Sequence, residues 1–527
     1  MSVSAFLSRI LLVLLPVVAI SNLYIYFYPV WRNCSFARPA RGNEPAPFRL
    51  LTFGDPQLEG DTSLPPKPVY IPLDFNRALT SLRERDPTAL KSQIRNFITS
   101  TLAIPRYQVQ YFRKHLDLIG NDYYLAHIYR TLYWYTKPTH VTVLGDLLGS
   151  QWIRDEEFER RSWRFWHRVF KGSSKVPLDR LTHEDGAAVH EEVLGADDNW
   201  SKWIFNVPGN HDIGYAGDID EARVERFERE FGPVNGDIRF RLTESEEDSP
   251  TIRLIVLNTM NLDQPQLSED LAHDTISFLN GAMGSAKDVG NSRETTILLT
   301  HIPLHKEAGV CADAPLFSYF KEEEGGGIRE QNFLSYDSGR NAILQGLFGL
   351  HPSIDAPAQG LGRDGIILTG HDHEGCDVYH WIDRDTELWN AQRWGQANTT
   401  ALVADVLQPG IREVTVRSMM GDFGGNAALV SAYWNDGGHK WQIDVKNCQF
   451  GVQHIWWAVH VLDIITVLLV MIVGVAYLAG VISGRLGSSV NSKSGDRKAS
   501  GKAKQHSSSG HKSSKAQSKP STARRKA

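Results

Sequence analysis

The segment GIILTGHDHEGCD at residues 365–377 places two histidines, His371 and His373, directly after a short apolar run. Side chains two residues apart in an extended chain point to the same side, so both imidazoles can converge just past the end of a strand. Two converging imidazoles are typical of a metal site. A histidine-rich surface turn would have the same sequence, so this segment alone leaves both interpretations open.

Four further segments share this pattern, an apolar run that stops at a side chain able to bind a metal ion. Each run is short and rich in Val, Ile, Leu and Thr, which predicts a strand buried on both faces. The side chains at the ends of these runs are Asp55 and Gln57, Asp146, Asn210 and His211, and His301. A further run, RLIVLNT, ends at Asn258 without an obvious ligand.

Strands of this kind are typical of layered α/β folds, in which functional sites gather beyond the carboxyl ends of the strands. Glycines flank nearly every candidate ligand and allow tight turns and a close approach of the backbone; they are Gly54, Gly145, Gly209 and Gly370. Any single run has a plainer explanation, because a turn must follow a buried strand. The whole series favours one site assembled from distant parts of the chain.

The ordered series D-x-Q, G-D, G-N-H-D, H-x-P and G-H-x-H resembles the signature of the calcineurin-like metallophosphoesterases over residues 47–425. The resemblance implies an α/β fold of the four-layer αββα type, with two mixed sheets face to face, helices outside and two divalent metal ions at one edge. By the same resemblance, the ligands would be Asp55, Gln57, Asp146, Asn210, His301, His371 and His373.

The resemblance also assigns roles. Asp146 would bridge two ions about 3.5–4 Å apart, which bind an anionic phosphate and lower the pKa of an attacking water. Asp55 and His373 would hold the first ion, with Gln57 nearby, and the other ligands would hold the second. His211 would donate a proton or hydrogen bond to the leaving oxygen. Asp212 would either orient His211 or cap the turn.

Gln57 stands where most of that superfamily has histidine. An amide oxygen is a weaker and harder ligand than an imidazole, which favours Mn at the first position, with Fe or Zn as alternatives. The same difference opens a second interpretation, a weakened site kept for binding rather than for turnover.

Both ends of the chain carry long uncharged apolar segments, residues 10–30 and 464–482. About nineteen helical residues span roughly 28 Å, close to the hydrocarbon thickness of a bilayer. Trp456 and Trp457 suit the interfacial aromatic belt. We predict an N-terminal transmembrane anchor in residues 1–31, for which a cleaved signal peptide is the alternative, and a second transmembrane helix at 455–482.

The residues after the second helix form a basic tail. Residues 488–527 contain eleven Lys or Arg, one Asp and almost no large apolar residue, so we expect this tail to be disordered. The positive-inside rule keeps such a tail in the cytosol, which places both termini there and a domain at 47–445 in the lumen. Anionic lipid or a coat protein is the expected partner of the tail, in preference to nucleic acid.

Glycosylation sequons and cysteines support the luminal placement. Three N-x-S/T sequons lie between the predicted helices, at Asn33, Asn199 and Asn398. Four cysteines are present. Cys34 and Cys448 flank the two helices, and Cys311 and Cys376 lie in the loops after His301 and His373. In an oxidising compartment each pair could form a disulfide, and four free thiols are the alternative.

Four segments narrow the resemblance. The segments FGDPQLEGD, LGDLLGSQWI, NVPGNHDIGY and ILLTHIPLHKEAGVCADAP are similar to the fungal branch of membrane-anchored phosphoesterases that remodel GPI glycans, which shares the Asp-Pro-Gln variation. That resemblance implies removal of an ethanolamine-phosphate side branch from a GPI mannose in the endoplasmic reticulum, which promotes exit of GPI-anchored proteins. The segment GDLLGSQWI favours the type that acts on the second mannose.

The same resemblance implies the partners and the location. GPI-anchored proteins or the GPI lipid would be the substrate, and cargo receptors or coat proteins of ER exit would be partners. The protein would reside in the ER membrane, with cycling to the Golgi left open. Two alternatives stay open: a hydrolase of the same fold that acts on another phosphoester or a lipid pyrophosphate, and a catalytically weak module that binds cargo.

The stretch between the first two candidate ligands, residues 59–139, is long and rich in aromatic residues with helical spacing. Those aromatics could line a glycan site or face lipid. We expect most of them to belong to the core.

Overall fold

The computed structural model describes residues 3–39, 44–84, 86–182, 188–244, 248–397 and 408–495. The sequon at Asn398 and residues 496–527 of the basic tail lie outside the described residues. The chain divides into two compact units, residues 19–461 and the two terminal segments. The first unit contains the sheets and the candidate ligands.

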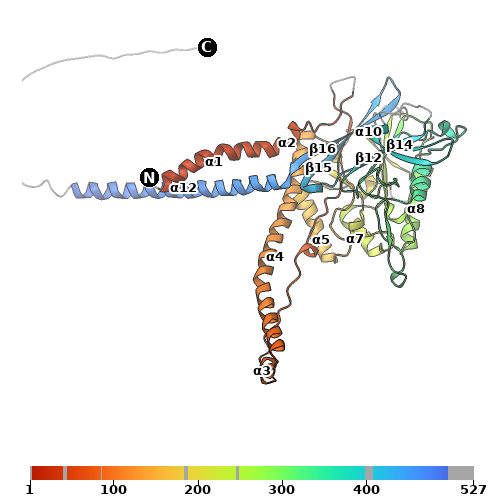
Figure 1. The fold of residues 1–527 in the computed structure, drawn as a ribbon. Coiled ribbons are helices and arrows are strands. Elements are labelled where there is room, and N and C mark those ends of the chain that lie inside the picture. Colours follow the sequence, from red (N-terminus) through yellow and green to blue (C-terminus); the bar gives the residue numbers. More distant parts are fainter. Residues whose placement is uncertain are drawn as a thin grey trace, which may run out of the picture. The chain divides into compact units, whose positions relative to one another are not determined.

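Two mixed sheets form the centre of this unit (Figure 1). The six-stranded sheet has the order β16 (Lys440–Val452), β15 (Gly424–Asn435), β1 (Phe48–Phe53), β2 (His140–Val143), β5 (Trp203–Asn206) and β3 (Ser174–Lys175). Its strands β1, β2, β5 and β3 run parallel, whereas β15 and β16 are antiparallel to their neighbours.

The eight-stranded sheet has the order β13 (Trp389–Arg393), β12 (Cys376–Ile382), β14 (Gly410–Thr415), β11 (Gly365–Thr369), β8 (Glu294–Leu299), β7 (Thr251–Val256), β6 (Gly236–Arg241) and β4 (His190–Val193). Strands β7, β8, β11 and β14 are parallel. A separate ribbon pairs β9 (Phe317–Tyr319) with β10 (Ile328–Gln331). The predicted near-continuous apolar runs are therefore central parallel strands.

Two buried clusters hold these elements together. One cluster draws Phe48 and Leu50 from β1 together with Phe240 from β6 and Leu254 from β7, so the sheets pack against each other. The other cluster combines the opposite faces of both sheets with helices. These helices are α4 (Pro87–Thr136), α5 (Asp155–Arg164), α7 (Glu221–Phe231), α8 (Glu269–Gly284) and the short η7 (Gly339–Leu347).

Helix α4 occupies most of the long stretch between the first two candidate ligands. It begins where Asp86 caps the backbone N–H groups of Thr88 and Ala89 and Pro87 fills the first turn, and it ends before Lys137 in the left-handed region. Tyr124 and Tyr129 in its second half are buried, as expected of core residues. The first half, with the preceding helix α3 (Phe75–Arg83), exposes most of its apolar side chains, contrary to that expectation.

Among the described residues, two helices are long and apolar enough to cross a membrane. They lie within α1 (Val3–Tyr26), over Ala5–Tyr26, and within α12 (Gln453–Gly495), over Gln453–Ile482. Both overlap the predicted spans at 1–31 and 455–482. Helix α12 continues to Gly495, into the segment that we predicted to be a disordered tail.

Candidate metal centre

The side chains that follow five strands, β1, β2, β5, β8 and β11, meet in one place. Asp55, His301 and His371 each stand two positions beyond the last residue of their strand. The carboxyl ends of parallel strands share one edge of a sheet, so short connections bring these side chains together. One ligand atom from each of Asp55, Asp146 and His301 lies within 4.8 Å of the other two, and all three residues are buried.

A second group forms around the amide oxygen of Asn210. His301 Nε2 lies 3.0 Å from Asn210 Oδ1, and His371 Nδ1 lies 2.9 Å from it. The opposite nitrogen of each ring donates to a backbone carbonyl, His301 Nδ1 to Leu144 at 2.7 Å and His371 Nε2 to Gln331 at 2.9 Å. This arrangement is typical of metal-binding histidines, because the second hydrogen bond fixes the ring orientation.

Three atoms converge here: Asn210 Oδ1, His301 Nε2 and His371 Nδ1. When both rings are neutral, each carries its proton on the opposite nitrogen, so all three atoms are hydrogen-bond acceptors. Burial lowers the pKa of His371 to about 3 and also lowers the pKa of His301, which keeps the rings neutral. A cation between the three acceptors would bind all of them. Without a cation, the Asn210 amide can rotate so that its NH2 group donates to the rings.

Gln57 connects the remaining candidate ligand to this network. Its amide Nε2–H donates to Asp146 Oδ2 at 2.9 Å and lies 3.2 Å from His373 Nε2. The structure therefore brings together all seven predicted ligands through hydrogen bonds or close contacts. The nitrogen of the Gln57 amide, rather than its oxygen, faces Asp146 and His373.

The two predicted catalytic residues differ in their surroundings. The backbone N–H of His211 donates to Asp146 Oδ1 at 2.8 Å, and its ring is 39% exposed with Nε2 3.7 Å from Asp146 Oδ2. The carboxylate of Asp212 is buried and accepts three backbone N–H groups, from Leu147 at 3.1 Å, Leu148 at 2.9 Å and Gly209 at 2.9 Å. Asp212 thus joins two ligand-bearing turns, which is the arrangement of the turn-capping alternative.

The backbone at this centre is held in an uncommon conformation. Four predicted ligands have a positive φ in the left-handed region: 42° at Asp55, 41° at Gln57, 49° at Asp146 and 73° at His371. Such a conformation costs a non-glycine residue about 1–3 kcal/mol and persists only where the surroundings enforce it, which is typical of functional sites.

The donor set fits divalent metal ions. Asp55 Oδ2 is buried and has no hydrogen-bond partner. Burial raises the pKa of the Asp55 carboxyl well above its ordinary value, and the charge of Asp146 raises it further. Asp55 and Asp146 are therefore a buried pair of acidic groups, and a nearby positive charge would stabilise their charged forms. Carboxylate, amide and imidazole donors together suit Mn, Fe or Zn.

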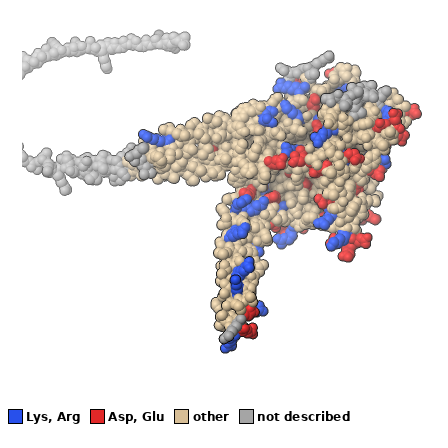
Figure 2. Space-filling view, viewed as in Figure 1, with Lys and Arg blue, Asp and Glu red and all other residues tan. Residues whose placement is uncertain are grey.

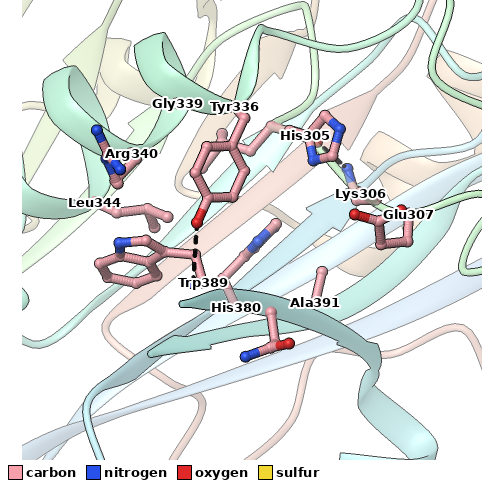
Figure 3. Close-up of a pocket in the computed structure, with 12 residues that line it drawn as sticks. His305, Lys306, Glu307, Tyr336, Gly339, Arg340, Leu344, His380, Trp389 and Ala391 are labelled. Carbon is pink, nitrogen blue, oxygen red and sulfur yellow. Dashed lines mark hydrogen bonds between the residues drawn. The ribbon is translucent and has the colours of Figure 1, made fainter. Parts of the chain in front are cut away.

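The loop after His301 is braced by charged residues that the motifs did not reveal. Lys306 Nζ lies 3.0 Å from Glu413 Oε2, and Glu413 Oε1 accepts the Leu304 N–H at 3.0 Å. His380 contacts the same carboxylate and also lines a pocket with Tyr336 (Figure 3). The sequence signal for this brace was weak, because Glu413 stands next to Arg412 in the mixed segment GIREVT of strand β14.

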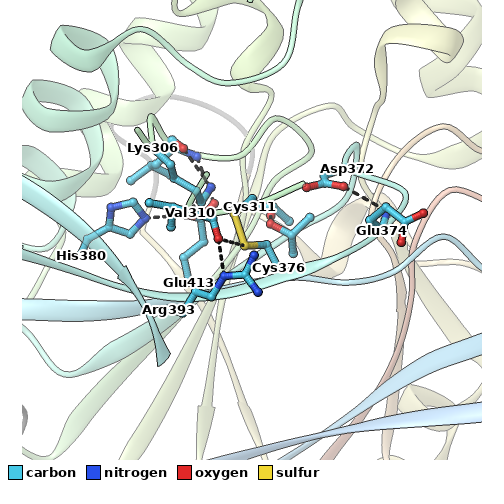
Figure 4. The surroundings of a disulfide bond; sticks show 12 residues. Lys306, Val310, Cys311, Asp372, Glu374, Cys376, His380, Arg393 and Glu413 are labelled. Atoms are coloured by element: carbon cyan, nitrogen blue, oxygen red, sulfur yellow. Dashed lines mark hydrogen bonds and ion pairs between the residues drawn. A yellow bond between two sulfur atoms is a disulfide. The ribbon is translucent and has the colours of Figure 1, made fainter. Parts of the chain in front are cut away.

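Both cysteine pairs form disulfides. Cys311–Cys376 joins the loop after His301 to β12, next to the Lys306–Glu413 pair (Figure 4). Cys34–Cys448 joins the segment after α2 (Tyr28–Trp31) to β16. Each connects segments that were predicted as partners, with Cα atoms 5.8 Å and 5.5 Å apart respectively.

Comparison with known proteins identifies relatives over most of the chain. Protein TED1 of Saccharomyces cerevisiae is 32% identical over 485 residues, which are 84% of this chain and 86% of TED1. An uncharacterized protein of Schizosaccharomyces pombe is 26% identical over 408 residues, 70% of this chain and 84% of that protein. Metallophosphoesterase 1 of Danio rerio is 24% identical over 281 residues, 50% of this chain and 60% of that protein. No family model matches the chain.

Proposed function

Because the chain belongs to the calcineurin-like metallophosphoesterases, in the same family as protein TED1, we propose that it is a two-metal phosphodiesterase. Its substrate would be an ethanolamine-phosphate side branch on a mannose of the GPI anchor, with the second mannose favoured. The observation that carries the reaction class is one network of seven polar side chains, in contact with one another, at the ends of five strands. The substrate rests on the resemblance of four segments to the GPI-remodelling branch.

The residues of this centre would have distinct roles in metal binding and proton transfer. Asp146 would bridge two divalent ions, Mn being favoured over Fe or Zn, and Asn210 would complete the second site. When bound, the ions supply the positive charge that holds the phosphate and lowers the pKa of the attacking water. The partly exposed ring of His211 would donate a proton to the leaving oxygen, since its backbone is fixed on Asp146 and its Nδ1 has no partner.

We propose the four-layer αββα arrangement for the fold. The sheets supply the two inner layers, since one buried cluster lies between them. Helix α4 would cover the six-stranded sheet, and α8 with η7 would cover the eight-stranded sheet, because their residues share a cluster with the outer faces.

The catalytic unit would face the ER lumen, with both termini in the cytosol. Two disulfides suit an oxidising compartment, and Asn33 and Asn199 are exposed, as glycosylation requires. The two apolar helices would hold the site near GPI lipids in the luminal leaflet, which raises the local concentration of substrate.

A second candidate function is a cargo-binding module with little turnover. The Gln57 amide is the feature that favours it, because its nitrogen donates to Asp146 in this structure and only the rotated amide would offer an oxygen to a metal ion. Such a module would bind GPI-anchored proteins without trimming their glycans.

Mass spectrometry of GPI glycans in cells that lack the protein tests both candidates. We expect ethanolamine phosphate to accumulate on one mannose, and to disappear again when the wild-type protein or the exposed control variant Asp436→Ala is restored. Asp146→Ala should fail to restore trimming. Full restoration by Asp146→Ala would contradict the proposed role of the metal centre in trimming. Unchanged glycans in cells without the protein would contradict the proposed substrate and favour the binding module.

A further inference from the structure

The first half of α4 and the helix α3 form an arm that extends away from the two sheets (Figure 1). We define the arm as residues 69–84 and 86–119. Lys114 pairs with Glu59 at 2.7 Å near the base of the arm, and most of the arm's large apolar side chains are exposed. The arm lies between Asp55 and Asp146 in the sequence, and none of its residues is a predicted ligand of the metal centre.

One face of the arm is a continuous apolar stripe. Its residues are spaced three, four or seven positions apart, which places them on one side of a helix with 3.6 residues per turn. They are between 42% and 69% exposed, which is unusual for large apolar side chains in such number. The stripe consists of Ile94, Ile98, Leu102, Val109, Phe112, Leu116 and Ile119.

The charges of the arm are arranged around this stripe. Residues 88–116 contain five Lys or Arg and no Asp or Glu. At about 100° per residue, Arg95, Arg106 and Arg113 fall along one border of the stripe. Figure 2 shows Lys and Arg side chains distributed along the arm, with uncharged surface between them and acidic side chains at its far end. An apolar stripe bordered by basic residues is typical of a helix that lies in a membrane interface.

The base of the arm packs on the first turns of α12. A Cβ atom on Gly120 would overlap the ring of Trp457, so only glycine allows the two helices to approach this closely. Gln453 Nε2 donates to Asn121 Oδ1 at 2.7 Å, and the rings of Tyr124 and Trp456 lie 5.7 Å apart. The stripe therefore reaches the level at which the apolar helix α12 begins.

We infer that the arm lies in the membrane–water interface of the bilayer that α1 and α12 cross. The stripe would enter the boundary between headgroups and acyl chains, and the arginines on its border would contact lipid phosphates. Lipid is the occupant that fits both the one-sided positive charge and the contact of the arm's base with Trp457, since tryptophan concentrates at that level of a bilayer. A second copy of the same arm would bring like charges together.

The test uses the full chain with single cysteine labels. All four native cysteines are in disulfides, so an added cysteine is the one free thiol. Val109→Cys places a label on the stripe, and Gln110→Cys places the matched control on the exposed polar side of the same helical turn. The labelled proteins, carrying an environment-sensitive fluorophore, are reconstituted into phosphatidylcholine–phosphatidylserine vesicles.

We expect a lipid-borne spin-label quencher to act several-fold more strongly on the label at position 109, and an aqueous quencher to act more strongly at position 110. Equal access of the aqueous quencher to both positions would overturn the inference. A label at position 109 that is shielded from both quenchers would also overturn it, because that result means a protein partner covers the stripe. Neither result depends on catalysis, so the outcome is independent of the proposed enzymatic function.

Discussion

Asp212 joins two ligand-bearing turns through three buried N–H···O hydrogen bonds. In Asp212→Asn, the amide NH2 would face one of these donors and leave it without an acceptor. We expect the free energy of unfolding to fall by about 1–3 kcal/mol, measured by denaturant titration in detergent. The exposed control Asp436→Asn should change it by less than about 0.5 kcal/mol. Lost activity at unchanged stability would instead support a role for Asp212 in orienting His211.

Gly145 precedes the predicted bridging ligand and packs on a second ligand. Its φ is 88°, and a Cβ atom there would overlap the His301 ring. Gly172 has a similar φ of 97° with no atom within 4 Å of an added Cβ. Both Gly→Ala variants should lose roughly 1 kcal/mol of stability from backbone strain.

Only Gly145→Ala should also displace His301 and lose bound metal. Metal content per molecule after gel filtration measures this difference. Equal metal content in the two variants would show that the His301 ring moves without consequence, and would argue against its role as a ligand.

The sequence predicted those parts of the site that are side chains next to a strand end. Asp55, His301 and His371 could be found this way because a buried strand has a recognisable composition and the next turn follows at once. The carbonyl of Gln331, which orients His371, could not be found, because a backbone atom carries no residue signal. The orientation of the Gln57 amide could not be predicted either, because the sequence identifies the residue but not which amide atom faces Asp146.

At the scale of elements, the two disulfides secure different things. Cys311–Cys376 joins two segments that carry predicted ligands and closes a loop of 65 residues. Cys34–Cys448 closes a much longer loop, of 414 residues. Removing the longer closure should cost about 1.6 kcal/mol more, because the entropy of the unfolded chain rises with the logarithm of loop length.

Paired Cys→Ser variants test this assignment. We expect Cys34→Ser/Cys448→Ser to lower the melting temperature more and keep its metal, and Cys311→Ser/Cys376→Ser to lose metal more readily to a chelator. Equal metal retention in the two paired variants would mean that the Lys306–Glu413 brace holds the loop after His301 without the disulfide.

Helix α4 shows where pattern analysis fails at this scale. An apolar stripe with helical spacing predicts a helix, and the helix is present. The same stripe suits a protein core or a lipid surface, because both are apolar. Burial of Tyr129 and exposure of Phe112 in one continuous helix depend on where the sheets end, and no local pattern encodes that position.

At the scale of the whole molecule, the inferred site of the arm and the proposed substrate both lie at the same membrane surface. If the arm lies in the interface, it adds a third contact with the membrane beside α1 and α12, and it fixes the height of the catalytic unit above the lipid. Substrate tethered to the same bilayer then meets the site at a high effective concentration. A soluble phosphodiester gains nothing from this arrangement.

Val109→Glu/Phe112→Glu should therefore separate the two kinds of substrate. Two charges on the stripe oppose its insertion, and losing the burial of two large apolar side chains should reduce turnover of GPI glycolipid in vesicles roughly tenfold. Hydrolysis of a soluble phosphodiester should stay within about twofold, since the arm carries no predicted ligand. The control Asn96→Glu/Gln110→Glu adds the same charge at exposed polar positions and should leave both activities unchanged. An equal loss of activity on both substrates would mean that the stripe supports the fold. A contact between the stripe and the bilayer would lower activity on the membrane-bound substrate alone.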